Sequence, residues 1–246
     1  MKTNTNQRFD EHDSIISYQQ LRMFIGILGF LLTFLLVLTT TFLSDTSIFK
    51  VSISHYYYSF GHIIFTGSLC ILGGLFLTYR GKDRWENRLS NCTGFFAICV
   101  AAFPTKYSGY EGKTYINISD GFYEIWMNYI HFGAAFLLFL SFSIFCLYFF
   151  QKSDSGEDHL NTQELINKKK NRNRYYKFCG WGIIVSIALI AFFSFFTNEE
   201  LYPNNLLVKY NTIIFETTAL FFFSTSWLMK SSEIFRVKFP FMNYFR

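Results

Sequence analysis

Charged residues are scarce in this sequence: Asp, Glu, Lys and Arg make up 16% of its 246 residues, whereas soluble domains carry about 25%. A soluble domain of this length would alternate apolar and polar residues at the period of a helix or a strand. Here the hydrophobic residues, which make up 51% of the chain, are concentrated in long blocks. This distribution excludes an ordinary soluble domain and indicates an integral membrane protein.

Several motifs that would define a reaction are also missing. The chain has no Gly-x-Ser-x-Gly elbow, no P-loop and no dinucleotide fingerprint. Membrane hydrolases of the ceramidase and adiponectin-receptor type hold zinc with Ser-x-x-x-His and His-x-x-x-His pairs. Both pairs are absent around three histidines of the chain. The residues four positions before His55, His62 and His131 are Val51, Tyr58 and Met127. The five cysteines include no Cys-x-x-Cys spacing and are expected to be small buried hydrophobic residues.

Six apolar segments are candidates for crossing a bilayer, whose hydrocarbon core is about 30 Å thick and needs about 20 helical residues. The sequence therefore predicts an all-α polytopic membrane protein with six transmembrane helices in a single domain over residues 1–246. The first segment is long and lacks a small-x-small cleavage site, which favours a retained span over a signal peptide. The expected spans are 21–43, 62–79, 89–103, 126–150, 178–196 and 211–228.

The Lys and Arg residues between these segments predict the orientation, because positive charge accumulates on the cytoplasmic side. Segments 1–22, 80–88, 151–177 and 229–246 contain 3, 4, 7 and 4 of the 22 basic residues. The remaining four, Lys50, Lys106, Lys113 and Lys209, fall in the other three connections. We therefore expect both termini in the cytoplasm, in short tails.

The same distribution bears on partners. It explains the net charge of +5 as topology, so we expect membrane lipids and no nucleic acid as partners; the oligomeric state is not encoded in any motif. The basic run that precedes the fifth span is expected to be a topology anchor, with contact to anionic headgroups as the alternative.

Small and aromatic residues carry two packing predictions. Small residues in two spans would permit close approach of helices. They are Gly67, Ser68, Gly73 and Gly74 in the second span and Gly133, Ala134 and Ala135 in the fourth. The span-end pairs Tyr79–Arg80 and Trp227–Lys230 are expected to be anchors at the inner membrane interface.

Ionisable side chains at membrane depth are costly and are the first place to look for function. Glu216 in the sixth segment, His131 in the fourth and His62 at the start of the second all fall in the outer third of the predicted bilayer. Glu124, Asn128 and His131 follow one another at spacings of four and three, so they share one face of a helix. The candidate ligand-binding residues are His55, His62, Glu124, Asn128, His131 and Glu216.

Two interpretations of this set stay open. In the first, Glu216 and His131 form a hydrogen-bonded lock between spans. In the second, His62, His131 and Glu216 bind a ligand headgroup or a metal ion, since two imidazoles and a carboxylate are a legitimate ligand set for zinc or iron. No cofactor is expected from the sequence, and a metal stays an alternative.

Four stretches carry a resemblance to a known group: SISHYYYSFGHIIFTGSLCILGGLFLTYRG, NCTGFFAICVAAFPT, HFGAAFLLFL and ETTALFFFSTSWLMK. They resemble uncharacterised bacterial six-span membrane proteins and, more distantly, the DRAM-like family. The shared features are an outer Ile-Ser segment before the second span, a His in the fourth and a Glu in the sixth. The resemblance implies a six-span architecture in a bacterial inner membrane and no reaction. The chain departs from the DRAM-like Ile-Ser-Asp, because His55 follows Ile53-Ser54.

The function expected from these features is non-enzymatic: an outward-facing polar pocket that binds a lipid headgroup or a small amphiphile. One alternative is a metal-dependent membrane-embedded hydrolase that uses His62, His131 and Glu216. A second is a small-solute or proton-coupled transporter, which would need a polar path across the whole membrane.

Overall fold

The computed structural model describes residues 18–43, 49–106, 122–152, 163–196 and 205–238, without the side chains of residues 18, 122–124, 164–165 and 232–238. Every regular element in this part of the chain is helical, which confirms the all-α prediction. The elements are α1 (Tyr18–Leu43), η2 (Ser54–Tyr58), α2 (His62–Thr78), α3 (Arg84–Ala102), α4 (Phe122–Ile144), η3 (Phe145–Phe149), α5 (Gln163–Phe196) and α6 (Leu206–Lys238). The short η2 is a 3-10 helix, and η3 is a π-helical turn that extends α4.

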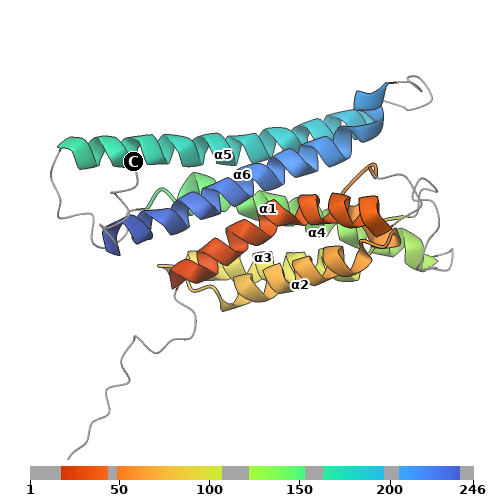
Figure 1. Cartoon of the computed structure of the whole chain (residues 1–246), viewed down its shortest axis with the longest axis horizontal. Helices are drawn as coiled ribbons and strands as arrows, with labels where there is room; N and C mark the ends of the chain where they lie inside the picture. The colour runs from red at the N-terminus through yellow and green to blue at the C-terminus, as the bar shows by residue number, and fades with distance from the viewer. Residues whose placement is uncertain (1–17, 44–48, 107–121, 153–162, 197–204, 239–246) are drawn as a thin grey trace, which may run out of the picture.

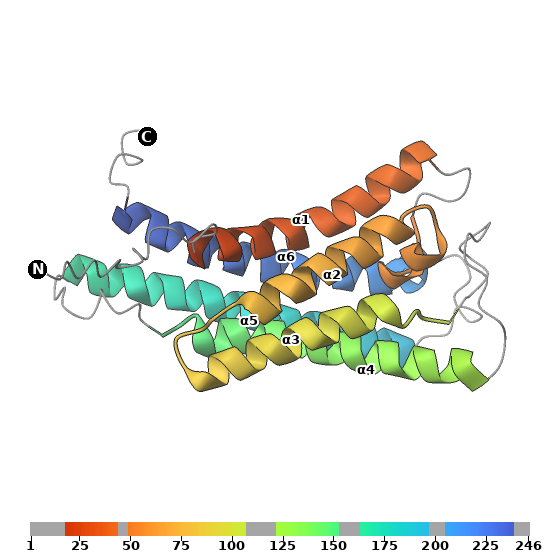
Figure 2. The same cartoon turned by 90° about the horizontal axis from the view of Figure 1, so that it is seen from below.

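The six long helices form a ring. Each packs against its neighbours in sequence, and α6 closes the ring by packing against α1. Successive helices run in opposite directions, so the starts of α1, α3 and α5 lie at the same end as the ends of α2, α4 and α6 (Figure 2). We call this end, which carries Arg22, Arg80–Arg88, Lys152, Lys168–Lys177 and Lys230, the basic end; the other is the η2 end. Figure 1 shows that α5 and α6 lie side by side along the molecule.

Four of these helices are long and apolar enough to cross a membrane: 19–42, 125–149, 166–196 and 206–231. Helix α2 is apolar but has 17 residues. Helix α3 covers residues 89–102 of the predicted third span, but it begins earlier, at Arg84, and carries charged residues in its first turns. The helices alone therefore define a multi-pass membrane protein with four clear spanning candidates.

Local sequence explains both ends of α3. Asp83 caps its start, where the carboxylate accepts hydrogen bonds from the backbone N–H of Trp85 at 2.9 Å and of Glu86 at 2.8 Å. At the other end Phe103 is extended, with φ −109° and ψ 107°, because a residue before a proline is disfavoured in the α region. Pro104 thus ends α3 and begins the segment that reaches the candidate site.

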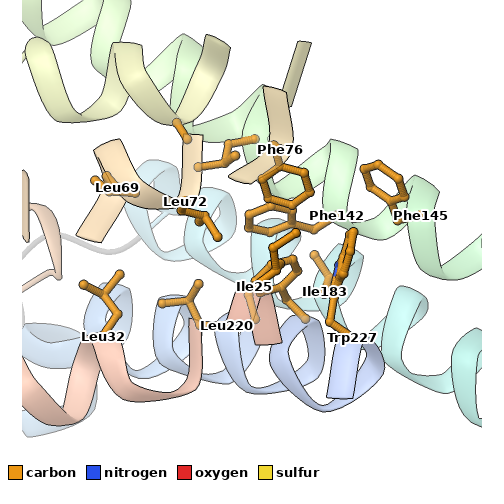
Figure 3. Packing of buried hydrophobic residues seen from close by; sticks show 14 of the residues in the cluster. Ile25, Leu32, Leu69, Leu72, Phe76, Phe142, Phe145, Ile183, Leu220 and Trp227 are labelled. Atoms are coloured by element: carbon orange, nitrogen blue, oxygen red, sulfur yellow. The ribbon is translucent and has the colours of Figure 1, made fainter. Parts of the chain in front are cut away.

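The centre of the bundle is filled by aromatic rings. Phe142 and Phe223 stack with ring centroids 3.8 Å apart, and Phe76 meets Trp227 edge to face at 5.3 Å. Figure 3 shows the rings of Phe76, Phe142 and Trp227 together between α2, α4 and α6. Leu32, Leu69, Leu72 and Leu220 belong to the same buried cluster and lie to one side of these rings.

The predicted role of the glycines is right at one position and wrong at three. A Cβ on Gly73 would lie 3.0 Å from the carbonyl oxygen of Gly94, and a Cβ on Gly94 would lie 2.7 Å from that of Gly73. Helices α2 and α3 therefore cross backbone to backbone at this pair. A Cβ on Gly67, Gly74 or Gly133 would meet nothing within 4 Å, so no helix of the described chain packs on them.

The predicted interface anchors Tyr79, Trp227 and Lys230 are wrong, because all three are buried inside the bundle. The Tyr79 hydroxyl accepts a hydrogen bond from Arg22 Nη2 at 3.1 Å and donates to Glu86 Oε1 at 2.8 Å. This charged network joins α1, the end of α2 and α3. The sequence could not distinguish an aromatic or basic residue that is buried in the bundle from one that faces the membrane interface, since both follow an apolar run.

Candidate functional site

The residues between α1 and α2 bring the candidate site together. Val51 accepts a backbone hydrogen bond from Ile213 N of α6 at 3.0 Å. Two residues later, Ile53 N donates to Glu216 Oε2, also of α6, at 2.6 Å. The segment 51–54 therefore runs along α6 and is held to it at two points.

His131 holds the next residue of the same segment. Its Nε2 lies 2.9 Å from Ser54 Oγ, and its Nδ1 lies 2.6 Å from the carbonyl oxygen of Phe103. The carbonyl can only accept, so Nδ1 carries a proton and donates to it. In the neutral ring Nε2 is then the acceptor, and Ser54 Oγ donates to it. A side chain with an exposed fraction of only 1% thus has both ring nitrogens satisfied.

The segment that follows α3 is fastened in the same place. Tyr58 of η2 donates to the carbonyl oxygen of Thr105 at 2.5 Å. Asn128 Oδ1 accepts from Lys106 N at 2.8 Å. Together with the bond from His131 to Phe103, these contacts satisfy two backbone carbonyl groups and one backbone N–H in the segment that follows α3.

We call the hydrogen-bonded set Ile53, Ser54, Phe103, His131 and Glu216 the junction. It connects Ile53 and Ser54, at the start of η2, with the end of α3 and with helices α4 and α6. The predicted hydrogen bond between Glu216 and His131 is wrong, because the two side chains bind the adjacent residues Ile53 and Ser54 instead of each other.

The other predicted site residues lie around the junction. Asn128 and His131 point from one face of α4 to the same segment after α3, as their spacing predicts. The side chain of Glu124 lies outside the described residues. His55 Nδ1 is 2.6 Å from Ser52 Oγ, a local contact within three residues. His62 Nδ1 is 3.1 Å from the carbonyl oxygen of Tyr57, and the two rings meet edge to face at 4.4 Å.

The metal hypothesis requires His62 to join His131 and Glu216. Among the residues that the structure describes, no group of three or more His, Cys, Asp or Glu side chains is placed to hold a metal ion. His131 also has both ring nitrogens engaged in hydrogen bonds. His62, His131 and Glu216 therefore each bind a different part of the chain: Tyr57, the pair Ser54 and Phe103, and Ile53.

A cavity of about 50 Å³ lies beside the junction. Its polar lining groups are Ser54, Ser68 and Glu216, and the rest of its wall is apolar or backbone. Of the five candidate residues whose side chains the structure describes, only Glu216 lines it. The apolar wall is formed by Leu28, Leu32, Ile53, Phe65, Leu69, Leu72, Val100, Ala135, Leu138, Phe139, Phe142 and Leu220. The pocket expected to be polar is thus a mainly apolar cavity with a carboxyl group in its wall.

Sequence reasoning missed three partners at this site: the backbone N–H of Ile53, the hydroxyl of Ser54 and the hydroxyl of Tyr58. All three belong to the connection between α1 and α2. The available signal was the polar run from Ser52 to His55 next to a tyrosine cluster, but no spacing rule links that run to residues in α4 and α6.

The fold and the junction fit the class of multi-pass helical membrane proteins. Comparison with protein families, with curated proteins and with solved structures finds no match to this chain. Its function must therefore be argued from its own geometry.

Proposed function

We propose that this is a six-span membrane protein with both termini in the cytoplasm, which binds a small amphiphile in the cavity beside Glu216. The role is one of binding, without catalysis. The observation that carries it is the composition of the cavity wall, in which Glu216 and Ser54 stand at the edge of an otherwise largely apolar surface.

The six-span topology is supported by the ring of alternating helices and by the basic end. Helix α2 is short for a bilayer, but it is packed closely against α3 at Gly73 and Gly94. Labelling of engineered cysteines tests the orientation. Lys169→Cys at the basic end and Lys209→Cys at the η2 end should react with membrane-impermeant reagent from opposite sides; reaction from one side would overturn the topology.

The chemistry of the wall selects the ligand. A carboxyl group and a hydroxyl group accept hydrogen bonds, so they favour a ligand that ends in an alcohol or an amine. Leucine and phenylalanine side chains around them favour an alkyl portion, because burial of apolar area is favourable. A cavity of about 50 Å³ has room for a few water-sized groups. The ligand is therefore a short amphiphile or the end of a longer one.

A photoactivatable alkanol tests this assignment. After irradiation of the purified protein, peptide mass spectrometry should locate the label on the cavity-lining residues of α2, α4 or α6, and excess unlabelled alkanol should reduce it. Labelling confined to the lipid-facing surface, or labelling that excess alkanol does not reduce, would contradict the proposal.

A pair of matched variants separates the cavity from the surface. Ala135 lines the cavity, so Ala135→Leu should fill it and remove the competed label. Ala191 is exposed on α5, and Ala191→Leu should leave the label unchanged. Glu216→Gln keeps an oxygen that can accept from Ile53 N but removes the carboxylate; it should weaken labelling by an alkylamine more than labelling by an alkanol.

A further inference from the structure

One face of α5 at the basic end is exposed over several turns. Lys170, Arg174, Lys177, Trp181 and Val185 follow one another at spacings of four, three, four and four, so they share a face of the helix. All five are exposed, Trp181 with an exposed fraction of 58% and Val185 with 53%. The opposite face, with Tyr176, Cys179 and Ile183, is buried against the bundle. The exposed stripe is therefore basic over its first turns and apolar over the next.

The change from basic to apolar coincides with the expected edge of the bilayer. The stretch 178–196 contains no charged residue and is about 28 Å long at ~1.5 Å per residue, close to the thickness of a hydrocarbon core. With Phe178 at the edge of that core, Lys177 lies at the boundary and Arg174 about 6 Å beyond it. A headgroup layer is about 5–8 Å thick. Arg174 and Lys177 thus stand at the level of lipid phosphates.

The sign of the charge on this stripe is uniform. Between Ile166 and Phe196 the chain has six basic residues and no Asp or Glu. Helix α5 is also the least buried of the four clear spanning candidates, with 22% of its most apolar window buried inside the protein. An exposed basic surface that continues directly into exposed Phe178 and Trp181 matches an anionic phosphate joined to acyl chains.

We propose that this face of α5 binds an anionic phospholipid, with Arg174 and Lys177 on the phosphate and Trp181 against the acyl chains. The guanidinium of Arg174 presents a planar set of donors that suits phosphate oxygens, and Lys177 adds a point charge. The site lies at the basic end, on the face of α5 that is turned away from the helix bundle. It is separate from the cavity beside Glu216, so either assignment can fail without the other.

Native mass spectrometry of the full-length protein in mild detergent tests the site. Phosphatidylglycerol should bind more tightly than phosphatidylcholine. The variant Arg174→Gln/Lys177→Gln should lose about 30-fold in affinity for phosphatidylglycerol, the equivalent of ~1 kcal/mol for each basic residue. Its affinity for phosphatidylcholine should not change.

The matched control removes the same charge from the same end of the molecule. Arg80 and Arg84 are exposed on a different surface, so Arg80→Gln/Arg84→Gln should keep the affinity of the parent protein. Equal loss of affinity in both double variants would show a general charge effect and overturn the site. Equal binding of the two lipids by the parent protein, or no loss of affinity in either variant, would also overturn it. If the α5 double variant does not fold, Lys177→Gln alone, with an expected loss of about fivefold, carries the same test.

Discussion

Glu216 and His131, which belong to α6 and α4, hold adjacent residues of one connecting segment. Glu216 accepts from Ile53 N at 2.6 Å, and His131 Nε2 accepts from Ser54 Oγ at 2.9 Å. Two side chains separated by 85 positions in the sequence are therefore connected through the dipeptide Ile53-Ser54. The connection at the η2 end of the bundle is thus held by side chains from within two predicted spans, and substitution of either side chain should change the free energy of unfolding.

Removal of the imidazole should destabilise the protein. His131→Phe keeps a ring of similar size but leaves Ser54 Oγ and the carbonyl of Phe103 without their partner, at a cost of about 2–6 kcal/mol for two buried groups. The free energy of unfolding in mixed micelles measures the change. His62→Phe is the control, because this partly exposed ring makes a hydrogen bond through Nδ1 to the carbonyl oxygen of Tyr57; the substitution should cost less than about 1 kcal/mol. Similar losses in the two variants would contradict the role of His131.

The carboxyl group of Glu216 should be replaceable by an amide but not by a methyl group. Glu216→Ala leaves the buried N–H of Ile53 without an acceptor, which costs about 1–3 kcal/mol, whereas Glu216→Gln supplies another acceptor and should cost less. Unfolding measurements on the two variants give the comparison. A larger loss for Gln than for Ala would show that the hydrogen bond from Ile53 is not the stabilising contact.

The two halves of the junction should be energetically coupled. Because Ile53 and Ser54 are adjacent, loosening one loosens the other, and the double variant Glu216→Ala/His131→Phe should deviate from additivity by about 0.5–3 kcal/mol. Glu216→Ala combined with Asp83→Ala is the matched pair, since Asp83 lies at the opposite end of the bundle. That pair should add within about 0.5 kcal/mol. If both double variants were additive, the hydrogen bonds of Glu216 and His131 to the 51–54 segment would be energetically independent.

The sequence predicts some of these features well and others not at all, for physical reasons. The apolar segments predict the long helices because the requirement for apolar residues at membrane depth is local and averaged over many positions. The face shared by Asn128 and His131 follows from helical spacing and is confirmed by their contacts with the segment after α3. The expected position of Glu216 inside the sixth helix is likewise correct.

What the sequence could not predict depends on contacts between distant segments. The bond from Ile53 to Glu216 spans 163 positions and uses a backbone N–H, which every residue other than proline carries and which therefore leaves no trace in composition. The burial of Tyr79 and Trp227 depends on which face of a helix turns inward, and an apolar run surrounded by lipid carries no such information. Gly67 and Gly94 look alike in the sequence, although only Gly94 lies at a crossing.

The two glycines give a direct test of the crossing of α2 and α3. A Cβ on Gly94 would lie 2.7 Å from the carbonyl oxygen of Gly73, which belongs to the backbone and cannot turn away. Gly94→Ala should therefore lower the free energy of unfolding by about 1–3 kcal/mol. Gly67→Ala has open space and should be neutral or stabilising by up to about 1 kcal/mol, because alanine favours the helix. Thermal unfolding in detergent distinguishes the two, and a stable Gly94→Ala protein would show that the helices do not approach this closely.

The ion pair at the basic end predicts a dependence of stability on pH. Lys152 Nζ lies 2.5 Å from Asp83 Oδ2, and this hydrogen bond, aided by the backbone N–H of Glu86, lowers the pKa of Asp83 below its ordinary value of 3.8. A lowered pKa in the folded state means that the stabilisation is complete above the ordinary pKa and is lost as the pH falls through the lower, folded value. Because both side chains are about one-third exposed, with fractions of 34% and 37%, the effect should stay below about 1 kcal/mol.

Comparison of the parent protein with Asp83→Asn isolates the charge, since asparagine still caps α3. The parent should be more stable at about pH 7, and the difference should vanish as the pH falls toward about 2, when the carboxyl group is protonated in both states. Unfolding free energies across this range measure it. A difference that persists at the lowest pH, where no carboxylate is left to pair with Lys152, would show that the stabilisation does not come from the charge pair.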